Sequence, residues 1–168
     1  LASIVPGWAD KVTDLSQLDN DKVYVLRSER AFLLYSDKLP AQLCSSTGKV
    51  IGSVTASLTD PTQQFRIEKN GDNYYLFSVG AQKYVSSNGN YEANASTPLT
   101  IQQVNNASYP WKLSLNGNEL NSQNSGQMDA GITVSNWDTP DAGNCYYIEE
   151  AIPEDKVYTV VVLGTEDP

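Results

Sequence analysis

The stretch GNCYYI at residues 143–148 repeats a pattern that occurs twice more, as TQQFRI at 62–67 and as SYPWKL at 108–113. In each copy a small polar cluster precedes an aromatic residue, any residue and an aliphatic residue. Such repetition is typical of one supersecondary unit used several times, with the apolar residues of each copy packed against the others. The sequence therefore predicts a closed assembly of three degenerate repeats with pseudo-threefold symmetry. The aromatic residues expected to be buried near its axis are Phe65, Trp111 and Tyr146.

The composition favours short strands and turns over helices. The 168-residue chain holds 10 Tyr, 11 Gly and 8 Pro, and only 18% of its residues are charged. Tyr is enriched in strands, and Gly and Pro mark the turns between them. A chain of this length supports one hydrophobic core. We therefore expect a single all-β domain.

Two similar stretches predict the hairpins that open the first two repeats. VYVLRSERAFLLYS from Val23 and YYLFSVGAQKYVSS from Tyr74 align without a gap. Each reads as an apolar strand, a tight polar turn and a second strand. In this alignment Tyr24 matches Tyr75. The third equivalent, NELNSQNSGQ from Asn118, is more polar, which points to a role other than packing.

Flanking segments lie on both sides of the repeats, which span residues 21–150. In the lead-in 1–20, Leu15 and Leu18 follow Asp14 with the spacing of one helical turn. This pattern predicts a short helical turn docked on the body of the domain.

The tail 151–168 contains VYTVVVL at 157–163, an uncharged run that is strongly β-prone and must pair with something. It is either a closing strand of this domain or the start of a following module. The second interpretation rests on the tetrapeptide Asp-Lys-Val-Tyr, which occurs at both 21–24 and 155–158. Because the chain opens at Leu1 without a Met, we expect it to be a piece of a longer protein.

The charge of the chain argues against two kinds of partner. The formal net charge is −9, with 20 acidic against 11 basic residues. An acidic surface repels phosphate backbones and anionic lipid headgroups, so we expect neither nucleic acid nor membrane as a partner. No stretch approaches the roughly 18 apolar residues of a membrane-spanning helix.

The cysteines and the absence of histidine bear on chemistry. Cys44 and Cys145 lie in different repeats, and we expect both to be reduced and unpaired, although one disulfide is compatible with the sequence. Because the chain has 0 His, neither thiol has the usual partner that would activate it as a nucleophile. The acidic pair Glu149 and Glu150 is consecutive, and a strand sends consecutive side chains to opposite faces. We expect no enzymatic activity and no cofactor.

The closing elements resemble the Gln-x-Trp motif of the ricin-type β-trefoil lectins. They are Gln63-x-Phe65, Tyr109-x-Trp111 and Asn144-x-Tyr146. The third repeat is most similar, because Leu120-Asn121, then GITVSNWD at 131–138, then Gly143-Asn144 follow the family's order. The opening segment also resembles β-trefoil modules appended to secreted bacterial proteins that process glycans. The resemblance implies a β-trefoil fold, a secreted or cell-surface location, a glycan as partner and a neighbouring domain of the same parent protein.

The resemblance also implies a binding site on the third repeat. In these lectins a sugar stacks on an outward aromatic residue while amides or carboxylates bind its hydroxyls. Trp137 takes the place of the platform, Asn121 that of the hairpin polar group and Asn144 that of the closing polar group. Asp138 and Asp141 add carboxylates beside them. Asn121 stands where the family usually has Asp, which puts selectivity for galactose-type sugars in doubt.

Other interpretations of these residues stay open. Trp137 is otherwise an inward core residue, because Trp is highly buried on average. Asp138, Asp141 and Asn144 are otherwise turn residues that cap local backbone, or oxygen ligands for a calcium ion. At the level of the whole domain, the alternative to glycan binding is a spacer or protein-interaction module without a sugar site.

Overall fold

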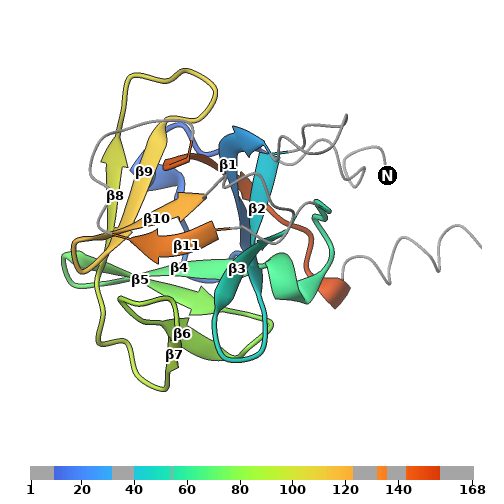
Figure 1. Cartoon of the computed structure of the whole chain (residues 1–168), viewed down its shortest axis with the longest axis vertical. Coiled ribbons are helices and arrows are strands. Elements are labelled where there is room, and N and C mark those ends of the chain that lie inside the picture. The colour runs from blue at the N-terminus through green and yellow to red at the C-terminus, as the bar shows by residue number, and fades with distance from the viewer. Residues whose placement is uncertain (1–9, 32–39, 54, 123–131, 136–142, 156–168) are drawn as a thin grey trace, which may run out of the picture.

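The computed structural model describes residues 10–31, 40–53, 55–122, 132–135 and 143–155 (Figure 1). In these residues twelve strands join into one sheet. They are β1 (Tyr24–Ala31), β2 (Pro40–Ser45), β3 (Val50–Ser53), β4 (Phe65–Asn70), β5 (Asn73–Ser78), β6 (Lys83–Val85), β7 (Tyr91–Glu92), β8 (Leu99–Gln103), β9 (Trp111–Leu115), β10 (Asn118–Ser122), β11 (Ile132–Ser135) and β12 (Cys145–Glu150). Two short 3-10 turns accompany them, η3 (Leu15–Gln17) and η4 (Pro61–Gln63).

Six of the strands close into a barrel. The antiparallel pairs run from β1 to β4, β5, β8, β9 and β12, and β12 pairs with β1 again. The other six strands form the hairpins β2–β3, β6–β7 and β10–β11, each joined to the barrel through its first strand. The same four-strand topology thus occurs three times, in a first unit β1–β4, a second unit β5–β8 and a third unit β9–β12. The predicted all-β trefoil is confirmed.

The pairing register aligns the three units residue by residue. Tyr24 lies opposite Phe65, Tyr74 opposite Leu99, and Trp111 opposite Tyr146. Tyr24, Tyr74 and Trp111 are therefore equivalent, as are Phe65, Leu99 and Tyr146.

Two details of the predicted alignment were wrong. Tyr24 corresponds to Tyr74 rather than to Tyr75, and Trp111 opens the third unit instead of closing the second. Two adjacent tyrosines fit the apolar pattern equally well, and only strand pairing decides which of them faces the core. Trp111 was assigned to the wrong unit because the first and last strands of a unit both begin with an aromatic residue followed by alternating apolar residues.

The predicted tight turn after Leu26 was also wrong. β1 continues to Ala31, and its partner β2 begins only at Pro40. The polar run at 27–30 looked like a turn, but Ser28 is buried opposite Tyr146. The second hairpin is confirmed, since β5 and β6 are separated only by the short turn 79–82.

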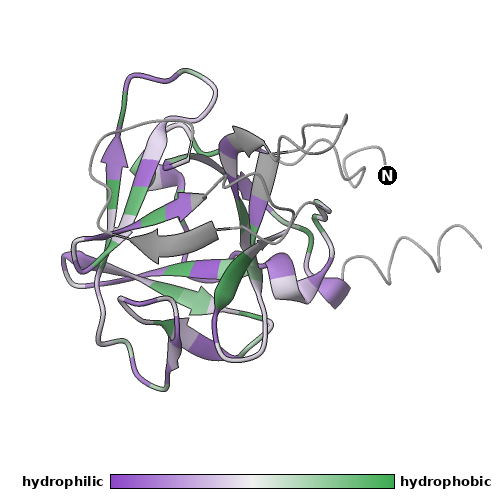
Figure 2. Ribbon diagram, viewed as in Figure 1, coloured by the Kyte–Doolittle hydropathy of each residue, from purple (hydrophilic) through white to green (hydrophobic). Residues whose placement is uncertain are grey.

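The barrel interior is filled by equivalent apolar residues from each unit, and the strands alternate between hydrophobic and hydrophilic residues (Figure 2). Phe65 is 0%, Trp111 2% and Tyr146 0% exposed, so their predicted burial is confirmed. Equivalent triplets supply the rest of the core: Leu26, Leu76 and Leu113; Ile67, Ile101 and Ile148; Leu43, Val85 and Leu120.

The described part of the lead-in packs against the barrel. Asp14 caps η3 by accepting from the backbone N–H of Ser16, and Leu15 and Leu18 pack against the core. The predicted helical turn is confirmed. Val12 is buried, and its backbone N–H donates to Ile148 O at 2.7 Å.

The chain leaves β12 along the body of the domain. The backbone N–H of Ile152 donates to Leu58 O at 2.9 Å, and Gln64 Nε2 donates to Ile152 O at 2.8 Å. The run at 157–163 lies outside the described residues, so the choice between a closing strand and a further module stays a prediction. The domain boundaries likewise stay predictions.

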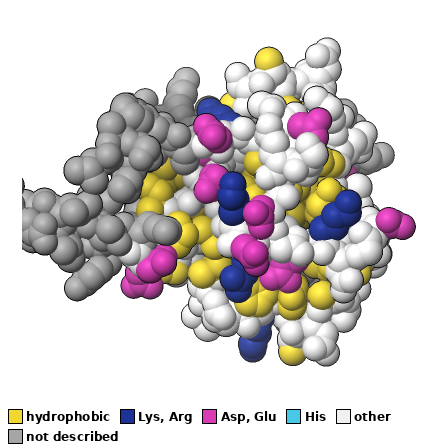
Figure 3. Space-filling view, turned by 180° about the vertical axis from the view of Figure 1, so that it is seen from behind, with side chains coloured by type: hydrophobic (Ala, Val, Ile, Leu, Met, Phe, Trp, Pro, Cys, Tyr) yellow, Lys and Arg dark blue, Asp and Glu magenta, His cyan; other side chains and the backbone are white. Residues whose placement is uncertain are grey.

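The cysteines and the surface charges bear on three of the predictions. Cys44 is half-buried and Cys145 buried, and no disulfide joins them. Their redox state stays a prediction. In the described ranges, no helix is long and apolar enough to cross a membrane. On the face seen in Figure 3, acidic and basic side chains lie interspersed over partly hydrophobic surface, so this face carries no single-sign patch.

Candidate functional site

The structure describes two of the five predicted site residues. Asn121 is half-buried on β10, opposite Thr133 of β11. Asn144 is 0% exposed and directly precedes β12. Trp137, Asp138 and Asp141 lie outside the described residues.

The position of Asn121 carries an amide only in the third unit. Leu43, Val85 and Leu120 are equivalent, so the residues that follow them, Cys44, Ser86 and Asn121, are equivalent too. The Cys44 thiol contacts Thr62 Oγ1 at 3.6 Å. The Ser86 hydroxyl donates to Asn88 Oδ1 at 2.6 Å. A planar amide with separate donor and acceptor groups at this position therefore distinguishes the third unit from the other two.

Asn144 has an equivalent in the first unit, Gln63, because each lies two residues before an equivalent buried aromatic. Gln63 is also buried, with 4% exposure. Its Oε1 accepts from Ser57 N at 2.9 Å and from Gln42 Nε2 at 2.6 Å, and its Nε2 donates to Thr55 O at 2.8 Å. Gln63 thus holds the backbone on both sides of Ala56, whose side chain is exposed. This network was not predicted, although a polar residue at a fixed distance before the aromatic was the signal for it.

A buried hydrogen bond joins two strands of the third unit. The Tyr146 hydroxyl donates to Leu120 O at 2.7 Å, which ties β12 to the residue beside Asn121. Burial, and then the nearby Glu119 carboxylate, raise the pKa of Tyr146 well above 10, so its hydroxyl stays a donor.

A buried ion pair lies next to this contact. Lys112 Nζ and Glu119 Oε1 are 3.3 Å apart, and their side chains are only 9% and 7% exposed. This pair was not predicted from the sequence, because Lys112 alternates with buried Trp111 and Leu113 and so reads as an outward residue. Its partner comes from the next strand and is visible only once β9 and β10 are paired.

The arrangement suits recognition of hydroxyl groups. An amide carries separate donor and acceptor groups. On the β10–β11 hairpin the Asn121 Oδ1 is buried, so binding of a hydroxyl falls to its Nδ2 donor. The described ranges contain no group of three or more His, Cys, Asp or Glu that would hold a metal ion. The calcium alternative depends on Asp138 and Asp141, which lie outside these ranges.

No protein-family model matches the sequence, and no curated protein matches it. Among solved structures, the chain is similar to a ricin B-like lectin from Macrolepiota procera, solved in complex with lactose. The TM-score is 0.59 at 15% sequence identity, and the alignment covers 81% of this chain and 99% of that chain. At this identity the likeness shows the fold, which is that of a lectin-like trefoil.

Proposed function

We propose that this chain is a non-catalytic carbohydrate-binding module of a larger secreted protein, with one weak glycan site on the third unit. Trp137 forms the stacking platform, Asn121, Asp138 and Asp141 bind hydroxyls, and Asn144 holds the loop that carries them. The observation that carries the proposal is the equivalence of Asn144 with Gln63.

The first unit supports the role given to Asn144. Counted back along the chain from Gln63 and Asn144, Trp137 matches Ala56. Counted forward from the equivalent Gly52 and Val134, it matches Thr55. Thr55 and Ala56 are both exposed. Ala56 is exposed because Gln63 bonds to the backbone on either side of it. If the Asn144 amide forms the same kind of side-chain to backbone hydrogen bonds with its own loop, Trp137 is directed outward. Since Asn144 is fully buried, its part in the proposal is to position the loop rather than to touch the sugar.

The fold likeness supports the choice of ligand class. The similar lectin was solved with lactose, which makes lactose the natural first probe. A single aromatic platform with a few side-chain hydrogen bonds stabilises a complex only modestly. The dissociation constant should therefore be about 1 mM, or about −4 kcal/mol.

Titration of the protein with lactose, together with a glycan array probed with the protein, tests this function. Trp137→Ala should abolish binding while the unfolding midpoint stays within experimental error of the wild type. Tyr146→Ala should lower stability and binding together, because Tyr146 belongs to the core. Tyr75→Ala, which removes a half-exposed aromatic residue from the second unit, is the matched control and should leave lactose binding unchanged.

The alternative is a spacer or protein-interaction trefoil that packs on a neighbouring domain of the same parent protein. The first two units favour it, since neither carries an amide at the position of Asn121. It would replace the lectin function if a broad glycan screen showed no binding that depends on Trp137.

A further inference from the structure

A row of three side chains crosses the outer face of the second unit. Arg66 on β4 lies opposite Phe77 on β5, and Phe77 lies opposite Tyr84 on β6. The Arg66 guanidinium lies 4.8 Å from the centre of the Phe77 ring. The Phe77 and Tyr84 rings meet edge to face with centroids 5.0 Å apart. The row therefore joins a cation to two half-buried aromatic rings.

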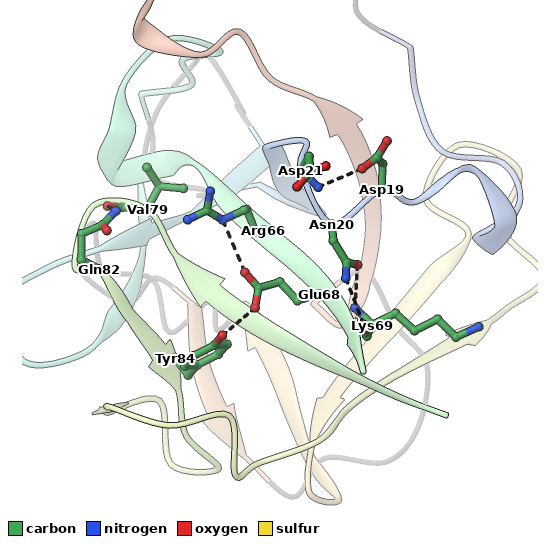
Figure 4. Close-up of polar contacts among 9 residues, drawn as sticks. All are labelled: Asp19, Asn20, Asp21, Arg66, Glu68, Lys69, Val79, Gln82 and Tyr84. Atoms are coloured by element: carbon green, nitrogen blue, oxygen red, sulfur yellow. Dashed lines mark hydrogen bonds and ion pairs between the residues drawn. The ribbon is translucent and has the colours of Figure 1, made fainter. Parts of the chain in front are cut away.

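Glu68 fixes both ends of this row (Figure 4). The Tyr84 hydroxyl donates to Glu68 Oε1 at 2.5 Å, and Arg66 Nε lies 3.5 Å from Glu68 Oε2. The hydrogen bond to Glu68, followed by burial, raises the pKa of Tyr84, so the hydroxyl remains protonated. Stacking and ion pairing together hold the guanidinium plane in one orientation.

The two terminal nitrogens of Arg66 are left available. Glu68 faces the Nε side of the guanidinium, where Nε is buried and forms an ion pair but no hydrogen bond. In Figure 4 they point away from Glu68, toward the turn that carries Val79 and Gln82. The Arg66 side chain is 34% exposed, so a ligand can reach it from solvent.

The equivalent row of the first unit shows what a structural arginine looks like in this fold. There Arg27 takes the middle place, which Phe77 takes in the other row, and lies opposite Tyr147 on one side and Gln42 on the other. Arg27 Nε donates to Gln42 Oε1 at 3.0 Å, and Gln42 continues into the buried network of Gln63. Arg27 is thus built into the scaffold by a hydrogen bond, whereas Arg66 is held only by stacking and an ion pair.

The turn beside Arg66 holds a strained residue. Gln82 has φ 55, in the left-handed region that non-glycine residues seldom adopt. Its side chain turns back, and Nε2 donates to Val79 O at 2.8 Å. Such strain persists where the surroundings hold it, and it gathers at binding sites. With Nε2 bonded to Val79, the Gln82 Oε1 is left to accept a hydrogen bond from a ligand.

We propose that Arg66, Phe77 and Gln82 form a second ligand site, which binds the carboxylate of an acidic sugar. A guanidinium presents two parallel donors that match the two oxygens of a carboxylate. The Phe77 ring lies 4.8 Å from the guanidinium and offers apolar surface to the C–H groups of a sugar ring, while Gln82 accepts from a hydroxyl. The inference rests on the proposed function only in taking a sugar as ligand, because its residues lie on the first and second units and none belongs to the third.

Electrostatics limits the affinity of this site. The net charge of −9 repels an anion, but at about 0.15 M salt charges more than about 8 Å away are largely screened. Glu68 lies within that range and offsets part of the attraction of Arg66. We therefore expect a dissociation constant in the millimolar range.

The test compares methyl β-D-glucuronide with methyl β-D-glucoside, which differ in the carboxylate, by calorimetry and by the NMR signal of the Arg66 side chain. The glucuronide should bind at least tenfold more tightly. Arg66→Lys keeps the positive charge but loses the two parallel N–H donors of the guanidinium, and should weaken binding at least tenfold. Lys83→Ala removes a neighbouring exposed cation and should change the affinity less than twofold. Gln82→Gly relieves the strained φ, so it should keep the fold and lower the affinity about threefold.

The outcomes separate this site from the third unit. Wild-type affinity in Arg66→Lys, or equal binding of glucuronide and glucoside, would overturn the proposal. Equally tight binding of N-acetylglycine would overturn it in favour of a peptide carboxylate. Loss of glucuronide binding in Trp137→Ala would assign the ligand to the third unit. Glucuronide binding that needs Arg66, in a chain that does not bind lactose, would uphold this site while the third-unit site fails.

Discussion

The indole nitrogen of Trp111 donates a hydrogen bond of 2.9 Å to the carbonyl oxygen of Val12, and both residues are buried. The bond ties the lead-in to the first strand of the third unit. Trp111→Phe keeps a large ring in the core and leaves the Val12 carbonyl without this donor. We expect it to lower the free energy of unfolding by about 1–3 kcal/mol, measured by urea denaturation. An unchanged denaturation midpoint would show that the lead-in packs without this bond.

Truncation of the core aromatics should cost more. Phe65→Ala, Trp111→Ala and Tyr146→Ala each remove a ring whose surroundings are fully packed. The expected loss is about 3–5 kcal/mol each, measured by the same urea denaturation. Tyr75→Ala is the control, because Tyr75 is half-exposed on the outer face, and it should cost well under half as much.

The ion pair of Lys112 and Glu119 should show strong coupling. Breaking a buried pair leaves one charge without compensation, so Lys112→Met alone should destabilise the fold by about 3–5 kcal/mol. Combining it with Glu119→Leu should restore most of the loss. A double-mutant cycle measures the coupling. Additive effects of the two changes would mean that the pair contributes nothing to stability.

Tyr147 should make the fold sensitive to alkali. Its ring stacks on Tyr109 at 5.3 Å and lies 4.2 Å from Lys11 Nζ, and burial raises the pKa of Tyr147 to about 12. The folded pKa lies above the unfolded value of about 10, so the stabilisation is fully present below about pH 10. It is lost as the pH rises from about 10 toward 12. Unfolding free energies measured across this range should fall less steeply in Tyr147→Phe than in the wild type. Parallel curves for the two proteins would contradict this.

How far the sequence predicts the structure depends on which residues carry the information. Burial of Phe65 and Tyr146 was predictable, because each follows a small polar cluster and begins a strand with alternating apolar residues. The register of Tyr74 was not, since only its partner Leu99 distinguishes it from Tyr75. The candidate site divides in the same way. The amide at Asn121 was visible from the sequence, whereas the Arg66 row depends on which strands lie side by side.

One contact between the two ends of the described chain has a consequence for how the domain is connected. The backbone N–H of Glu150 donates to Asp10 O at 3.0 Å, so the chain enters and leaves the barrel at one seam. A circular permutant that joins residue 155 to residue 10 through a short linker, and begins in the loop between β8 and β9, would keep every strand pairing of the barrel. The same geometry allows the domain to be carried on a single loop of a host protein, with most of its surface left open to solvent.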